Sequence, residues 1–73
     1  MATHFSHQKK IGEAIRKHRK NARMSQEKLA EQADLHPVYL GEVERGREAV
    51  SIRALIRISK ALGVRLRDLV AEV

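Results

Sequence analysis

Apolar residues recur at intervals of three and four along most of the chain, which is the spacing of an amphipathic α-helix. The first such stretch covers about residues 8–22, and its apolar stripe consists of Ile11, Ala14, Ile15, His18 and Ala22. The opposite face of that stretch is nearly all basic. Further helical stretches are expected at about residues 26–33, 37–45, 52–62 and 64–73. The pattern therefore predicts an all-α chain of five helices.

Three similar signals mark the starts of the middle helices. In each, a cap position lies between two apolar residues with the spacing of a hydrophobic staple. The three cap positions are Ser25, His36 and Ser51, and the staple pairs are Met24 with Leu29, Leu35 with Leu40, and Val50 with Leu55. Pro37 stands at a first helical position, where its missing N–H costs nothing. Gly46 and Gly63 can adopt the left-handed conformation that ends a helix.

The helices expected at residues 26–33 and 37–45 are joined by a turn too brief for antiparallel packing, so they should cross steeply. The second helix of such a pair protrudes, and it can enter a DNA major groove while the first lies across the phosphate backbone. The residues expected where the two helices touch are Leu29, Ala30, Ala33, Leu35, Leu40 and Val43. The stripe expected at the centre of the bundle is Ile52, Leu55, Ile56, Ile58 and Leu62.

The chain has 73 residues, which is enough for one small domain; we expect an N-terminal arm over residues 1–7 and a single domain over residues 8–73. The absence of cysteine excludes disulfides, thiolate zinc sites and cysteine nucleophiles. Fifteen Lys and Arg against nine Asp and Glu give a net charge of +6, and the excess lies within residues 1–23. Such local positive charge favours an anionic partner, nucleic acid first and an acidic membrane surface second.

Several classes of function are disfavoured. The two aromatic residues, Phe5 and Tyr39, are too few for a stacking single-strand binder, which favours duplex DNA. No apolar run could span a membrane and the start lacks a secretion signal, so a cytoplasmic protein is expected. No Ser, His and acid constellation indicates an enzyme or a small-molecule substrate. His4 and His7 lie three apart without supporting ligands, so neither a metal nor a cofactor is expected.

Three segments, in this order and spacing, resemble the Cro and phage-repressor-like helix-turn-helix family, also called the XRE family. They are residues 24–30 (MSQEKLA), 39–40 with 44–46 (YL and ERG), and 58–64 (ISKALGV). Residues 35–41 (LHPVYLG) and 44–47 (ERGR) look most like controller proteins of restriction–modification systems. The resemblance implies a compact five-helix bundle of the lambda-repressor type and a transcriptional regulator that binds DNA as a homodimer.

The resemblance also implies roles for individual residues. Arg19 and Glu44 match a buried ion pair that joins the first and third helices, and Gln26 matches a residue that contacts DNA near the backbone. The candidates for backbone contacts are Gln26, Lys28, Tyr39, Arg45, Arg47 and Arg53. The candidates for base-edge contacts are His36, Pro37, Val38 and Glu42. The candidates for a dimer interface are Leu66, Leu69, Val70 and Val73, although these residues could instead complete the core.

The third helix departs from the family pattern at the positions that face the groove. Where the family often has Gln, Arg, Ser or Thr, this chain has Pro37, Val38, Gly41 and Glu42. Pro37 and Val38 can contact a thymine methyl group, while Glu42 can accept from a cytosine amino group or repel phosphate. The apolar start of this helix also keeps open a protein-interaction module, such as an antitoxin or an adaptor.

Three further departures are expected to cost some stability. Asp34 replaces a common turn glycine, His18 replaces a leucine, and Arg65 stands at a usual capping Ser or Asp. The aromatic ring of Tyr39 is expected to pack partly against the first helices, and its hydroxyl either stays there or reaches a phosphate.

Overall fold

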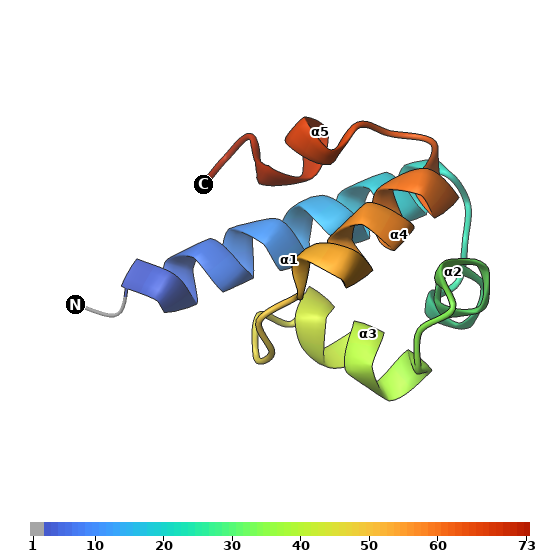
Figure 1. Cartoon of the computed structure of the whole chain (residues 1–73), viewed down its shortest axis with the longest axis horizontal. Helices are drawn as coiled ribbons and strands as arrows, with labels where there is room; N and C mark the ends of the chain where they lie inside the picture. Colours follow the sequence, from blue (N-terminus) through green and yellow to red (C-terminus); the bar gives the residue numbers. More distant parts are fainter. Residues whose placement is uncertain (1–2) are drawn as a thin grey trace.

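The computed structural model describes residues 3–73, with side chains from His7 onward, and within them it contains five helices and no strand (Figure 1). The helices are α1 (Thr3–Asn21), α2 (Gln26–Ala33), α3 (Pro37–Glu44), α4 (Ile52–Leu62) and α5 (Leu66–Val70). The predicted all-α class and the order of the helices are confirmed. The predicted start of the first helix was wrong, because α1 begins at Thr3 and not near Gln8. Residues 3–7 of the predicted arm therefore continue α1, while residues 1 and 2 lie outside the described residues.

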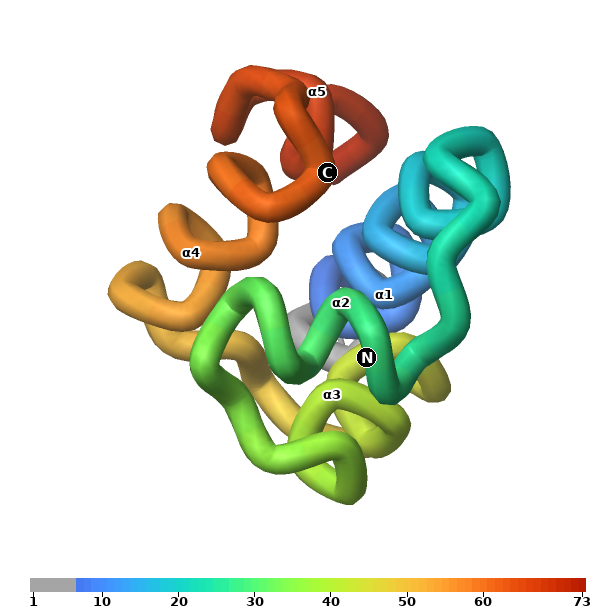
Figure 2. Tube along the Cα trace, turned by 90° about the vertical axis from the view of Figure 1, so that its right-hand side faces the viewer, coloured from blue at the N-terminus to red at the C-terminus, as the bar shows by residue number. Residues whose placement is uncertain are grey.

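The helices enclose one core, with α1 and α4 on opposite sides (Figures 1 and 2). Helix α5 covers one edge between α1 and α4, and α3 forms the opposite edge. The closest neighbours are α2 with α4, α1 with α3, α1 with α5, and α2 with α3. The largest fully buried side chains come from every helix: Ile15, Leu29, Leu40, Val43, Ile58 and Leu69. Helix α3 is thus held on its inner side by α1 and α2.

The predicted caps set the starts of α2, α3 and α4. Ser25 Oγ accepts from the N–H of Lys28 at 3.0 Å, and Ser51 Oγ accepts from the N–H of Ala54 at 3.1 Å. His36 Nδ1 accepts from the N–H of Val38 at 3.1 Å, so a ring nitrogen takes the place of a hydroxyl. Each bond satisfies one backbone donor that the first turn leaves free. These short helices therefore begin where the sequence predicted.

The turn between α2 and α3 depends on an uncommon backbone conformation. Asp34 has φ 56° and ψ 48°, in the left-handed region that favours glycine. This places the N–H of Leu35 2.8 Å from the carbonyl oxygen of Ala30, which closes α2. Asp34 therefore adopts the conformation for which glycine is the usual residue, and a second residue, Arg23, adopts a similar φ of 58° before α2, which the sequence did not predict.

Two groups of apolar residues lie elsewhere than predicted. Leu55 and Ile58 are in the core, but Ile52 is 67% exposed and Ile56 is 38% exposed, so only part of the α4 stripe faces inward. Leu69 is 1% exposed and belongs to the core. Its assignment to a dimer interface is therefore wrong, because a side chain already buried within its own protomer has no surface to offer.

Gly12 marks the closest approach of α1 to α3. A Cβ atom on Gly12 would lie 2.3 Å from the carbonyl oxygen of Val43 and 2.7 Å from that of Glu44. Because both atoms belong to the backbone, no side-chain rotation could relieve the clash. Glycine at this position lets α1 lie directly on the C-terminal turn of α3.

Candidate nucleic-acid interface

The N-terminal half of α3 presents an exposed edge of the molecule (Figure 1). His36, Pro37 and Val38 are exposed, and Val38 retains 65% of its surface. The inner side of the same helix is buried through Leu40, Gly41, Val43 and Glu44. The predicted division of α3 into a packed face and a protruding face is therefore present. No described helix has the length and apolar character needed to cross a membrane.

The predicted ion pair between Arg19 and Glu44 anchors α3 to α1. Arg19 Nε donates to Glu44 Oε2 at 2.7 Å and Nη2 donates to Oε1 at 3.0 Å. The two side chains are 11% and 1% exposed. Arg19 Nη1 also donates to the carbonyl oxygen of Met24 at 2.8 Å, in the turn that leads into α2. One guanidinium therefore connects α1, the turn before α2 and the end of α3, in the forked geometry that arginine provides.

Gln26 is attached to this ion pair. Its Nε2 donates to Glu44 Oε1 at 2.9 Å, although the side chain remains partly exposed at the N-terminus of α2. A Cβ atom built on Gly41 would lie 3.5 Å from both Gln26 Oε1 and Arg45 Nη2. The amide of Gln26 and the guanidinium of Arg45 thus come together over Gly41. Sequence analysis did not identify this junction, because no spacing rule relates residues 26, 41 and 45.

Glu42 and Arg45 form an ion pair along the exposed side of α3. Arg45 Nη2 donates to Glu42 Oε2, one turn earlier in the helix. The hydrogen bond from Arg45 lowers the pKa of Glu42. Desolvation by burial opposes this shift, and the charges of Arg45 and Arg47 add to it. The Glu42 carboxyl therefore stays ionised at neutral pH and can only accept hydrogen bonds.

Tyr39 connects α3 to the start of α4. Its side chain is half-buried and packs against the core, and its hydroxyl oxygen accepts from the N–H of Ser51 at 3.1 Å. Tyr39 is thus partly buried as predicted, but its hydroxyl reaches the start of α4 and does not stay against the first helices. Because a phenol both donates and accepts, the hydroxyl hydrogen of Tyr39 is still available to an acceptor outside the protein.

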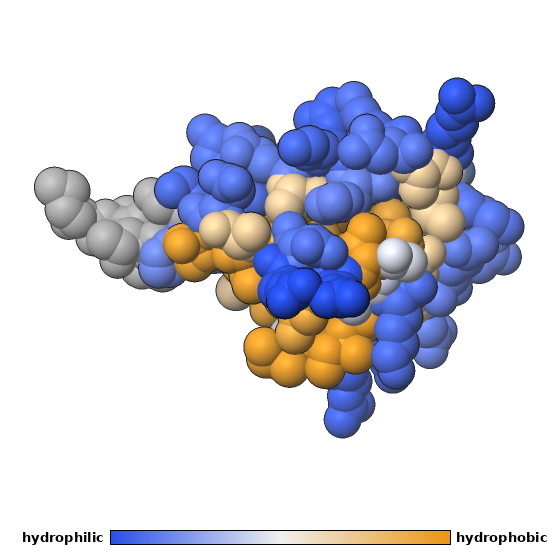
Figure 3. All heavy atoms as spheres, turned by 90° about the horizontal axis from the view of Figure 1, so that it is seen from above, coloured by the Kyte–Doolittle hydropathy of each residue, from blue (hydrophilic) through white to orange (hydrophobic). Residues whose placement is uncertain are grey.

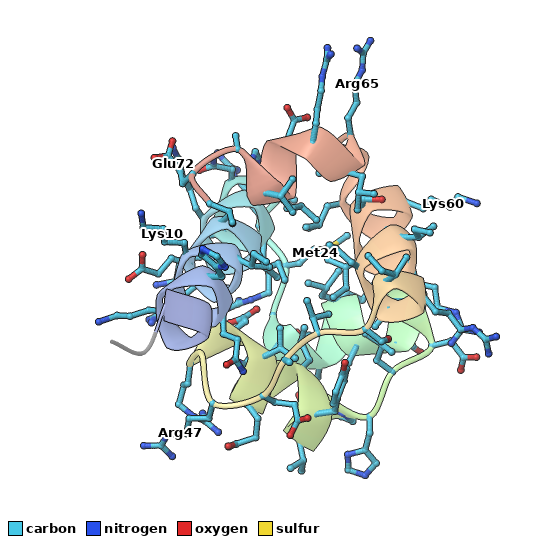
Figure 4. The ribbon with its side chains drawn as sticks, turned by 60° about the vertical axis from the view of Figure 1, so that its left-hand side comes forward. Lys10, Met24, Arg47, Lys60, Arg65 and Glu72 are labelled. Atoms are coloured by element: carbon cyan, nitrogen blue, oxygen red, sulfur yellow. The ribbon has the colours of Figure 1, made fainter. Side chains whose placement is uncertain are left out.

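The cations proposed from the sequence lie on several elements: Lys28 on α2, Arg45 and Arg47 at and after the end of α3, and Arg53 on α4. Lys28, Arg47 and Arg53 are exposed, and Lys28 Nζ lies 3.7 Å from Glu31 Oε1 in a pair that solvent screens. In Figure 4 the side chain of Arg47 extends outward beside α3, whereas that of Arg65 extends outward on the opposite side of the molecule. Arg47 therefore places a positive charge beside α3.

Lys9 is an exposed basic residue beside the loop that follows α3. A Cβ on Gly46 would lie 2.9 Å from Lys9 Cα, so the start of α1 passes next to the loop that carries Arg47. Lys10, by contrast, lines a hollow of about 330 Å³ between α1 and α5, together with Asp68 and Glu72. Among the described residues, no group of three or more His, Asp or Glu side chains could hold a metal ion.

Comparison with known proteins assigns the family. A family model described as helix-turn-helix matches residues 15–69. Control protein C.BamHI from Bacillus amyloliquefaciens is 47% identical over 60 residues, which cover 81% of this chain and 74% of that protein. The chain belongs to the helix-turn-helix family.

Solved structures of this helix-turn-helix family agree with the described fold. The restriction–modification controller protein C.AhdI from Aeromonas hydrophila superposes with a TM-score of 0.83 at 35% identity, over 85% of this chain and 94% of that protein. The clp gene regulator ClgR from C. glutamicum superposes with a TM-score of 0.84 at 35% identity, over 89% and 84% of the two chains. The predicted family is confirmed. The prediction of a DNA-binding regulator that resembles restriction–modification controller proteins is confirmed as well.

Proposed function

We propose that this helix-turn-helix protein binds duplex DNA as a homodimer in the cytoplasm and regulates transcription as the controller of a restriction–modification operon. The observation that carries this proposal is the outward face of α3, which the core does not use and beside which Arg47 extends. A helix presented in this way has the dimensions to enter a major groove. The names of the similar control proteins support the choice of operon.

The candidate residues then fall into two groups of contacts. The phosphate contacts are assigned to Gln26, Lys28, Tyr39, Arg45, Arg47 and Arg53, which come from α2, α3, the loop after α3 and α4. The base-edge contacts are assigned to His36, Pro37, Val38 and Glu42, which lie on α3. Gln26 reaches a phosphate from the N-terminus of α2, where free N–H groups attract anions. The hydroxyl hydrogen of Tyr39 is free to donate to another phosphate.

The dimer is proposed to form through apolar residues that one protomer leaves exposed on α4 and α5. Ile52, Ile56 and Leu66 are 67%, 38% and 36% exposed, and Val73 at the end of the chain is 51% exposed. In Figure 3 hydrophobic atoms gather on the side of the molecule where α4 lies. A two-fold axis would place these residues against their own copies. Leu66, Val70 and Val73 thus stay in the proposed interface, and Ile52 and Ile56 join it.

Selection of bound duplexes from a random pool tests the function directly. We expect a consensus that repeats with two-fold symmetry, with half-site centres about one helical turn apart, roughly 10 base pairs. Sedimentation of the Ile52→Ser, Ile56→Ser double variant should show monomers where the unchanged protein sediments as a dimer. A consensus without symmetry, bound by a monomeric protein, would rule out the homodimer.

A second candidate is a module that binds another protein through the same surface. The 65% exposure of Val38 favours it, because an apolar side chain at a protruding edge also suits a protein partner. A gel shift with mixed-sequence duplexes at low and moderate salt separates the two. A duplex that is shifted by the protein at low salt and released at moderate salt indicates DNA binding, since nonspecific binding depends on counterion release. A duplex that the protein does not shift even at low salt indicates the interaction module.

A further inference from the structure

Three outward side chains of α3 lie on one stripe of the helix. Val38, Glu42 and Arg45 are spaced four and three residues apart, which places them on the same face. Their exposure agrees with this position, since Val38 is 65% exposed and the side chains of Glu42 and Arg45 are 34% and 51% exposed. With a rise of about 1.5 Å per residue, Glu42 follows Val38 by roughly 6 Å. The stripe presents an apolar group, then a hydrogen-bond acceptor, then a cation.

The acceptor is held in a defined orientation by the cation. Arg45 donates to Oε2 of Glu42, while Oε1 has no hydrogen-bond partner among the described residues. The pairing offsets the repulsion that a lone carboxylate would meet between two phosphate strands. Glu42 can therefore enter a groove with one oxygen free, and that oxygen can only accept.

Pyrimidines differ at the two positions that such a stripe would meet in the major groove. Thymine carries a methyl group at C5 beside a carbonyl oxygen at C4, and cytosine carries an amino group at C4 beside an unsubstituted C5. A carboxylate accepts from the amino group and repels the carbonyl oxygen. A valine side chain gains by covering a methyl group. Cytosine methylated at C5 is the pyrimidine that offers both features on one base.

We propose that the α3 stripe recognises 5-methylcytosine, with Val38 on the C5 methyl group and Glu42 accepting from the 4-amino group. Arg45 is the positioning residue that orients Glu42. The inference rests on the proposed function, because it requires α3 in the major groove. Binding of the regulator then depends on cytosine methylation of its operator, so a DNA-modifying activity would alter regulation without altering the base sequence.

A four-way comparison of pyrimidines tests the two contacts separately. Binding duplexes are first selected from two random pools, one with cytosine and one with 5-methylcytosine. In the selected duplexes, each pyrimidine of the half-site is then replaced in turn by cytosine, 5-methylcytosine, thymine and uracil. These four bases combine methyl or no methyl with amino or carbonyl. At one position we expect 5-methylcytosine to bind about fourfold more tightly than cytosine and about tenfold more tightly than thymine. Uracil should bind most weakly.

Two variants assign the contributions to residues. Val38→Ala should abolish the gain from the methyl group and keep the preference for the amino group. Glu42→Gln should lose the amino preference, because an amide can face either an amino or a carbonyl group. Arg65→Ala, on the opposite side of the molecule, is the control and should leave all four ratios unchanged. Thermal unfolding of each variant verifies that the fold is retained.

The outcomes separate this inference from the proposed function. One outcome is a symmetric consensus in which no position shows tighter binding with a C5 methyl group that Val38→Ala abolishes. This outcome overturns the methylcytosine site but leaves the proposed DNA-binding function intact. A methyl gain at one base pair and an amino preference at another also overturn it, since two bases would then be read. Failure to bind any duplex removes both.

Discussion

The inner and outer faces of α3 are built from different interactions, although they belong to the same short helix. The inner face is buried and joined to α1 by Gly12 and by the Arg19–Glu44 pair. The outer face makes one ion pair along its own helix and otherwise faces solvent. Substitutions on the inner face should therefore change stability, and substitutions on the outer face should change binding with little effect on stability.

The largest expected effect is the loss of the buried ion pair. Arg19→Ala leaves Glu44 buried without its main partner and should lower the free energy of unfolding by about 3–5 kcal/mol. For a chain of this size that is a large share of the total. Denaturant unfolding measures the change. Arg19→Lys keeps the positive charge but loses the forked guanidinium, so its free energy of unfolding should fall by less than that of Arg19→Ala. An Arg19→Ala protein as stable as the unchanged chain would remove the anchoring role.

A second test of the inner face uses Gly12. Gly12→Ala would bring a methyl group against the backbone of Val43 and Glu44, so α1 and α3 must move apart. We expect a loss of about 1–3 kcal/mol, even though alanine favours helix formation. Glu13→Ala, at the neighbouring exposed position, is the matched control and should change stability by less than about 0.5 kcal/mol. Equal stability of the two variants would contradict the close contact.

The contrast between the two faces also explains what the sequence could predict. Caps and staples are local signals, so Ser25, His36 and Ser51 marked the helix starts within a residue. The Arg19–Glu44 pair was predictable only through the family resemblance, because its partners lie 25 residues apart.

Other features depend on tertiary packing that periodicity does not describe. Ile52 and Ile56 follow the helical stripe, yet the core is too small to cover them. The need for glycine at position 12 arises from the backbone of α3, and the junction over Gly41 arises from α2. Contacts between distant segments therefore had to come from the structure.

The outer face is tested by removing a cation next to it. Arg47→Ala should leave the free energy of unfolding within about 0.5 kcal/mol of its original value, because the side chain extends into solvent. The slope of log affinity against log salt should fall by about 0.9 for each protomer, as one phosphate contact is lost. A salt titration of duplex binding measures this. Arg65→Ala serves as control, and an equal loss of slope there would show that the charge acts without regard to position.

The smallest expected effect concerns the pH dependence of Glu42. Because Arg45 lowers its pKa in the folded protein, ionised Glu42 contributes to stability above the pKa of the unfolded chain, and this contribution is lost as the pH falls through the lowered folded value. Glu42→Gln should therefore lose slightly less stability on acidification than the unchanged protein, with the difference appearing below about pH 4.5. Since the pair is exposed to solvent, the difference should be small and should shrink further in salt. Thermal unfolding across this pH range measures it. A large difference would mean that the outer face of α3, like the inner one, supports the fold, and the separation between the two faces would then fail.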